Sequence, residues 1–107
     1  MPRLRRHHLD VHARRSHGDC VVTPDGELDL FTAAELTQAL REHERSARRL
    51  VLDLSKLRFL DSAGLALLIA QHRRAQQDGT EFAITNACGD VRRVLAVSGV
   101  DRVLASA

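Results

Sequence analysis

Short apolar stretches alternate with longer stretches of helical periodicity along this chain. Strand-like patterns, either alternating or continuously apolar, occur at residues 8–13, 20–23, 50–54 and 81–85. Helical spacing of apolar residues occurs at residues 32–46, 62–78 and 89–98. The predicted order is therefore two strands, then helix, strand, helix, strand and helix. Periodicity alone does not separate a buried strand from a buried helix at 50–54, and the tail after residue 99 receives no assignment.

This order predicts a single α/β domain with a mixed sheet of four or five strands. Strands joined through helices usually pair in parallel by right-handed crossovers. The turn signal at residues 16–19 joins the first two strands and predicts an antiparallel hairpin. Pro24 is expected to end the second strand or to place it at an edge, and Asp25-Gly26 to form a further turn. The helix that follows is expected to begin with a capping box made by Thr32 and Glu35.

The stretch from residue 50 to residue 69 is the centre of the chain's organisation. A buried strand at 50–54 is followed by a connection that ends in Asp61, a strong N-cap residue. Ser62 is therefore predicted in the first turn of a helix, followed by the small residues Ala63 and Gly64. A helix start of this kind exposes backbone N–H groups and a hydroxyl to any partner that docks there.

Composition and charge narrow the classes of partner. Apolar residues make up 44% of the chain, which is typical of a globular domain, but aromatic residues make up only 3%. The scarcity of aromatic rings disfavours single-strand nucleic-acid binding, which relies on stacking. Residues 1–19 hold five arginines and two aspartates, whereas the rest of the chain carries a net charge of −1. We therefore predict a disordered basic leader at residues 1–7, a domain at residues 8–107, and no nucleic-acid partner.

Several other classes of site lack their sequence signals. Cys20 and Cys88 have no metal-ligand spacing and are read as small buried hydrophobes in a reducing compartment. The four histidines between residues 7 and 17 match no metal-binding motif. No apolar run reaches the roughly 20 residues of a membrane span, and no apolar signal-peptide core follows the arginines. We predict a cytoplasmic protein without metal, cofactor or membrane contact.

Enzyme signatures are equally scarce. Ser62 lies outside a Gly-x-Ser-x-Gly elbow, and His72 is expected near the far end of the same helix, so a serine hydrolase is only a rival hypothesis. Asp53 near a strand end resembles the phosphoacceptor of response-regulator receivers, but the companion acidic pair is missing. We predict that the chain is not an enzyme and that Asp53 has a structural role.

Four segments together resemble the STAS domains that act as anti-sigma factor antagonists. They are Gly26-Glu27-Leu28-Asp29, the strand at 50–54, Phe59-Leu60-Asp61-Ser62-Ala63-Gly64-Leu65, and the third helical segment at 91–100. The resemblance covers about residues 20–105, and the Asp-Ser-x-Gly element is its most specific part. Pro24 and the Arg- and His-rich leader depart from the family pattern.

The resemblance implies a fold, a partner and a modification site. The sheet should carry its helices largely on one side, and the partner should be an anti-sigma factor that is itself an ATP-binding serine kinase. The phosphorylated residue should be Ser62, which implies a phosphatase that acts on phospho-Ser62. The docking surface should include the loop around Asp29 and the loop that carries Ser62. Its partner-binding residues are predicted to be Asp29, Asp61, Ala63, Gly64 and Leu65.

These inferences lead to a functional hypothesis of partner switching. The unphosphorylated domain would bind the kinase and so free a sigma factor, which makes it a regulator of transcription, and a phosphate on Ser62 would switch it off. The first rival is a STAS-type accessory module of a transporter or multiprotein complex that is not switched by phosphate. The second rival is the enzyme that uses Ser62 as its nucleophile.

Overall fold

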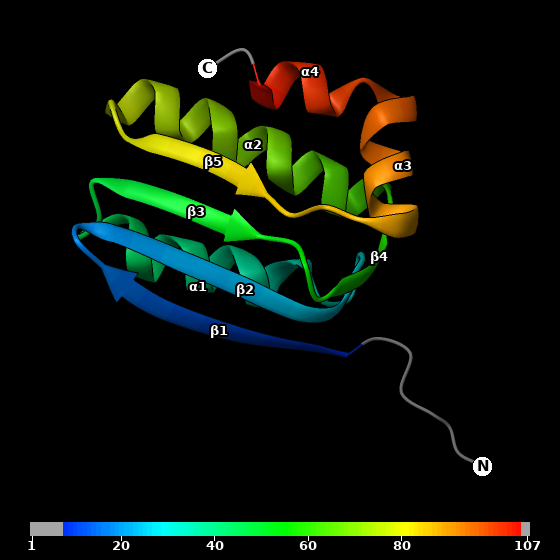
Figure 1. Ribbon diagram of the computed structural model, residues 1–107, viewed down its shortest axis with the longest axis horizontal. Helices are drawn as coiled ribbons and strands as arrows, with labels where there is room; N and C mark the ends of the chain where they lie inside the picture. Colours follow the sequence, from blue (N-terminus) through cyan, green and yellow to red (C-terminus); the bar gives the residue numbers. More distant parts are fainter. Residues whose placement is uncertain (1–7, 106–107) are drawn as a thin grey trace.

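The predicted mixed sheet is confirmed. The computed structural model describes residues 8–105, and its sheet has five strands in the order β1-β2-β3-β5, with β4 also paired to β2 (Figure 1). The pair β1·β2 is antiparallel, whereas β2·β3, β2·β4 and β3·β5 are parallel. The elements in chain order are β1 Leu9–Ser16, β2 Asp19–Leu28, α1 Ala33–Glu44, β3 Arg49–Asp53, β4 Leu57–Leu60, α2 Ser62–Asp78, β5 Glu81–Thr85, α3 Gly89–Ser98 and α4 Val100–Ala105.

The core lies between the sheet and the helices α1 and α2, which share one of its faces (Figure 1). It consists almost entirely of aliphatic side chains, as a chain with few aromatic residues requires. The fully buried leucines are Leu28, Leu36, Leu40, Leu50, Leu52, Leu54 and Leu68. On the same face Leu65, Ile69 and Ile84 are half-buried and pack against this core. The helices α3 and α4 follow β5, and α4 gives structure to a tail that the sequence left unassigned.

The second strand is longer than predicted. It continues through Pro24 and Asp25 to Leu28, so neither the expected strand end nor the expected turn is present. The reason is that β2 changes partner at this point: its pairing with β3 ends at Val22, and its pairing with β4 begins at Gly26. Pro24 lies between the segment of β2 that pairs with β3 and the segment that pairs with β4. Its missing N–H therefore removes no hydrogen bond to either of these strands.

Gly26 makes the change of partner possible. Its φ of +134° favours glycine, and the register of β2 against β4 shifts between Gly26 and Glu27. A Cβ at this position would lie 2.2 Å from the carbonyl oxygen of His8. The strand β4 itself was not predicted, because its four residues alternate neither in burial nor in polarity.

The described part of the chain contains neither a membrane-spanning helix nor a cluster of metal-binding side chains. Between residues 8 and 105 no helix is long and apolar enough to cross a bilayer. Within the same range no group of three or more histidine, cysteine or acidic side chains is arranged to hold a metal ion. The predicted basic leader, residues 1–7, lies outside the described residues.

Candidate functional site

Ser62 is the first residue of α2, and it is exposed. The helix begins there because Asp61 caps it: one carboxylate oxygen accepts hydrogen bonds from the N–H groups of Ala63 and Gly64, at 2.9 and 3.1 Å. The backbone carbonyl of Asp61 accepts the N–H of Leu65 at 2.9 Å. The predicted N-cap and the predicted first-turn position of Ser62 are both confirmed. Among the described residues no hydrogen bond forms with the Ser62 hydroxyl.

The start of α2 is tied to the end of β2. The N–H of Asp61 donates to the carbonyl of Leu28 at 3.3 Å, and Leu28 pairs with Leu60 of β4. Because β2 and β4 are parallel, both end at the same edge of the sheet. The loop that follows β2 therefore lies beside the turn that carries Ser62, as the family resemblance implied.

Asp29 organises this neighbouring loop from within. Its buried carboxylate accepts the N–H groups of Phe31 and Thr32, at 2.8 and 3.0 Å. The Thr32 hydroxyl donates to the carbonyl of Glu27 at 2.7 Å and accepts the N–H of Asp29 at 3.0 Å. The predicted capping box of Thr32 and Glu35 is therefore wrong, since Thr32 makes no side-chain cap to α1. The Asp29 carboxylate instead binds N–H groups in the turn before α1, and its backbone carbonyl accepts the N–H of Ala33, the first residue of α1, at 2.9 Å.

Three apolar side chains at this end of the molecule are exposed, and none of them was predicted as a site residue. They are Leu30 at 72%, Phe31 at 68% and Phe59 at 49% exposure. Leu30 and Phe31 lie in the loop after β2, and Phe59 lies in β4 opposite Glu27. Two of the three phenylalanines of the chain are thus placed in solvent, which is unusual for a domain whose core is short of aromatic rings. In the sequence Leu30 and Phe31 directly follow Asp29, and Phe59 lies three residues before Ser62.

Some of the predicted site residues lie at the surface, whereas others hold the backbone of the loops in place. Ser62 is exposed, and Ala63 and Leu65 are half-buried. Asp29 is buried and Asp61 is half-buried, and both use their carboxylates to fix backbone. These two residues shape the loops rather than extend into solvent.

Gly64 faces inward. A Cβ on Gly64 would lie 2.4 Å from Leu60 Cδ1 and 3.1 Å from the carbonyl oxygen of Leu28. Its missing side chain lets α2 approach the sheet. Any side chain there must move the residues that support Ser62.

Asp53 is a structural residue of the neighbouring loops. Partial burial works to raise its pKa, but hydrogen bonds from the Ser55 N–H and the Asn86 side-chain amide outweigh this effect and lower the pKa of Asp53. The two bonds measure 3.0 and 3.2 Å. Asp53 thereby links the loop after β3 to the loop after β5.

Comparisons with protein families, with other proteins and with solved structures find similarity over most of the chain. A family model described as "Mlab, STAS domain" matches residues 11–105. The chain is 29% identical over 98 residues to the anti-sigma F factor antagonist of Paenibacillus polymyxa, covering 90% of this chain and 84% of that protein. It is 34% identical over 87 residues to the anti-sigma-F factor antagonist RsfB of Mycobacterium tuberculosis, covering 80% and 70%. The crystal structure of an anti-sigma factor antagonist from Mycobacterium paratuberculosis has a TM-score of 0.82 and 32% identity, covering 91% of this chain and 83% of that one.

Proposed function

Because this chain belongs to the STAS domain family, and within it to the anti-sigma factor antagonists, we propose that it binds an anti-sigma factor serine kinase when unphosphorylated and releases it when Ser62 is phosphorylated. Binding of the kinase by this domain frees a sigma factor. The partner holds the ATP, and a phosphatase that removes the phosphate from Ser62 resets the domain.

The observation that carries this proposal is that an exposed serine lies at the same end of the sheet as three exposed apolar side chains. Ser62 begins α2 at the end of the sheet where Leu30, Phe31 and Phe59 are also exposed. Apolar side chains of this size are the usual anchors of a protein interface, and a serine among them is reached by a partner's active site in the same encounter. The docking surface of this proposal therefore consists of Leu30, Phe31, Phe59 and Ser62 with the half-buried Ala63 and Leu65, supported by Asp29 and Asp61.

A phosphate on Ser62 would change this surface without unfolding the domain. It adds about −1.5 to −2 charges at neutral pH. The start of a helix tolerates an anion, but here the Asp61 carboxylate already accepts the N–H groups of Ala63 and Gly64. The phosphate would therefore stay in solvent, beside a carboxylate, on the docking surface. If burying or displacing it costs about 4 kcal/mol, the affinity of the partner falls roughly a thousandfold.

The kinase should choose Ser62 over the other serines of the domain. The Ser98 hydroxyl donates to the carbonyl of Leu95 at 3.2 Å, at the end of α3, where the helix dipole disfavours added negative charge. Ser55 is exposed, but it lies in the turn before β4, without the cap and the following glycine. We expect a single phosphate, on Ser62.

The test is to measure partner affinity by calorimetry with phosphorylated and unphosphorylated protein, and circular dichroism shows whether both are folded. Ser62→Ala should bind the kinase and resist modification, and Ser62→Asp should bind more weakly. Ser55→Ala is the matched control and should still gain one phosphate. Equal affinities of the two forms would refute the switch and leave a binding module of the accessory type.

A further inference from the structure

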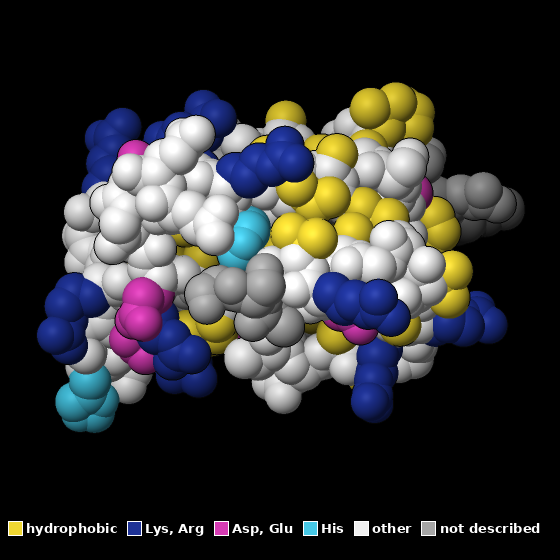
Figure 2. All heavy atoms as spheres, turned by 90° about the horizontal axis from the view of Figure 1, so that it is seen from above, with side chains coloured by type: hydrophobic (Ala, Val, Ile, Leu, Met, Phe, Trp, Pro, Cys, Tyr) yellow, Lys and Arg dark blue, Asp and Glu magenta, His cyan; other side chains and the backbone are white. Residues whose placement is uncertain are grey.

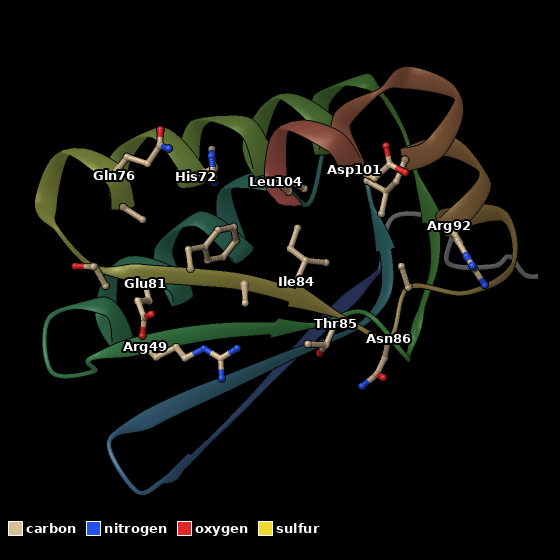
Figure 3. Close-up of a pocket in the computed structure, with 16 residues that line it drawn as sticks. Arg49, His72, Gln76, Glu81, Ile84, Thr85, Asn86, Arg92, Asp101 and Leu104 are labelled. Carbon is tan, nitrogen blue, oxygen red and sulfur yellow. The ribbon is translucent and has the colours of Figure 1, made fainter. Parts of the chain in front are cut away.

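A second surface lies away from Ser62, along the open edge of β5. A groove of about 680 Å³ runs beside this strand, within the range of about 300–1,000 Å³ that is usual for ligand pockets. One wall is β5 itself, and the other walls are formed by α2, α3 and α4 (Figure 3). In Figure 3, Ile84 points from β5 toward Leu104 of α4, His72 and Gln76 lie on α2, and Arg92 of α3 lies at the far end.

The backbone of β5 leaves hydrogen-bonding groups unused along its open edge. The N–H of Glu81 donates to the carbonyl of Arg48 at 3.4 Å, and the carbonyl of Thr85 accepts the N–H of Leu54 at 2.9 Å. Residues 81, 83 and 85 therefore face β3, because backbone groups alternate in direction along a parallel strand. The N–H and C=O groups of Phe82 and Ile84 face the opposite way, and in the described part of the chain no second strand pairs with them.

The two outer strands of the sheet differ in how they are protected. The edge strand β1 carries alternating and adjacent charges, including Asp10, Arg14 and Arg15, which discourage further pairing. From Phe82 to Thr85, β5 has no charge and no proline. A strand edge without charged side chains from residue 82 to residue 85 can accept an added strand.

We propose that this groove binds an extended peptide segment of a partner protein, which adds to the edge of β5 as a further strand. The charges that line the groove favour such an occupant, because Arg49 and Arg92 are balanced by Glu81 and Asp101. A groove without net charge suits an uncharged segment better than a polyanion. Figure 2 looks down on the α2 and α4 side, and it shows apolar side chains gathered toward the middle and right of this face.

The geometry also sets the pattern of the bound segment. Side chains alternate between the two faces of a strand, and one face of the added strand would meet the apolar side chains of Ile84 and Leu104. The other face would lie in solvent, on the side of the sheet that α1 and α2 leave open. The segment should therefore alternate apolar and polar residues, over about the length of β5.

The experiment selects random dodecapeptides on a display library against the full chain and titrates the selected peptides into isotope-labelled protein. The selected peptides should alternate apolar and polar residues, shift the amide resonances of Phe82 and Ile84, and slow their hydrogen exchange. Ile84→Lys should reduce the affinity roughly tenfold or more, and Val97→Lys, at an exposed position of α3 outside the groove, should not. Leu104→Glu, from the other wall, repeats the test without altering the strand.

The contrary results are equally specific. If no peptide is enriched, or if the selected peptides shift the resonances of Leu30, Phe31 and Phe59 instead, the strand-addition site is refuted. Affinities that are unchanged in both Ile84→Lys and Leu104→Glu would refute it as well. Ser62→Asp separates this site from the proposed switch, because it should weaken kinase binding and leave peptide binding unchanged.

Discussion

Replacing Gly64 with alanine measures how closely α2 approaches the sheet. In an open helix this change would stabilise the protein by about 1 kcal/mol, because glycine is the poorer helix former. Here the new Cβ would lie 2.4 Å from Leu60 Cδ1, 3.0 Å from Leu28 Cγ and 3.1 Å from the Leu28 carbonyl oxygen. The tip of Leu60 can move, but the Leu28 carbonyl belongs to the backbone and accepts the N–H of Asp61.

Overpacking of this kind costs about 1–3 kcal/mol. Because three atoms are too close and one of them is fixed, we expect the cost to exceed the helix-propensity gain. Gly64→Ala should therefore lower the free energy of unfolding, by up to about 2 kcal/mol. For a domain of this size each kcal/mol corresponds to a fall in Tm of about 4–8 °C.

Urea denaturation followed by circular dichroism gives the free energy, and an unchanged m-value confirms that the unfolding reaction is the same. Ala70→Gly, at an exposed position of α2, is the matched control and should cost about 1 kcal/mol through propensity alone. If Gly64→Ala proves more stable than the parent protein, the close approach of α2 to β2 and β4 is wrong. The inference that Gly64 supports Ser62 would then fail with it.

Three further predictions concern stability. Leu68→Ala removes a fully buried side chain and should cost about 2–5 kcal/mol, whereas a loss below about 0.5 kcal/mol would mean that the inner face of α2 is misplaced. Asp61→Ala removes the cap of α2 and should cost about 0.5–2 kcal/mol, and hydrogen exchange should localise the loss to the first turn of α2. Asp53→Asn tests the lowered pKa of Asp53: this carboxylate stabilises the fold above its ordinary pKa of about 4, and the stabilisation is lost as the pH falls through its lowered value. In urea denaturation, the free energy of unfolding of Asp53→Asn should therefore differ most from that of the parent protein near neutral pH, and the difference should vanish in acid. A difference that does not change with pH would contradict the lowered pKa of Asp53.

The parts of the fold that the sequence predicted have strong local signals. The helix at 62–78 was placed correctly, and the strand predicted at 50–54 lies at Arg49–Asp53, because a continuous apolar run, an Asp cap and a Gly79 terminator all agree there. The extension of β2 through Pro24 was missed because it depends on which strands pair with β2, and this pairing is a feature of the tertiary structure. A proline signals a strand end unless the strand changes partner at that residue, and no local pattern reveals such a change.

The site was predicted unevenly for a similar reason. Asp61 and Ser62 could be placed because capping is local chemistry. The inward orientation of Gly64 depends on Leu28, which is far away in the sequence. The exposure of Leu30 and Phe31 depends on how Asp29 folds the loop that carries them, and apolar residues before a helix are otherwise read as part of the core.

The cap explains why a charge on Ser62 would act on the surface and not on the fold. Had the first N–H groups of α2 been unoccupied, a phosphate could have been absorbed into the helix start and partly neutralised there. Asp61 already occupies the N–H groups of Ala63 and Gly64, and its own N–H is bound to Leu28. A phosphate on Ser62 would therefore gain few protein donors and would repel the adjacent carboxylate, so its charge would remain exposed at the start of α2, at the end of the sheet where the loop with Leu30 and Phe31 lies. In the proposed complex Leu30 and Phe31 would need a dry contact to contribute to binding, and a hydrated dianion at the neighbouring helix start would oppose that contact.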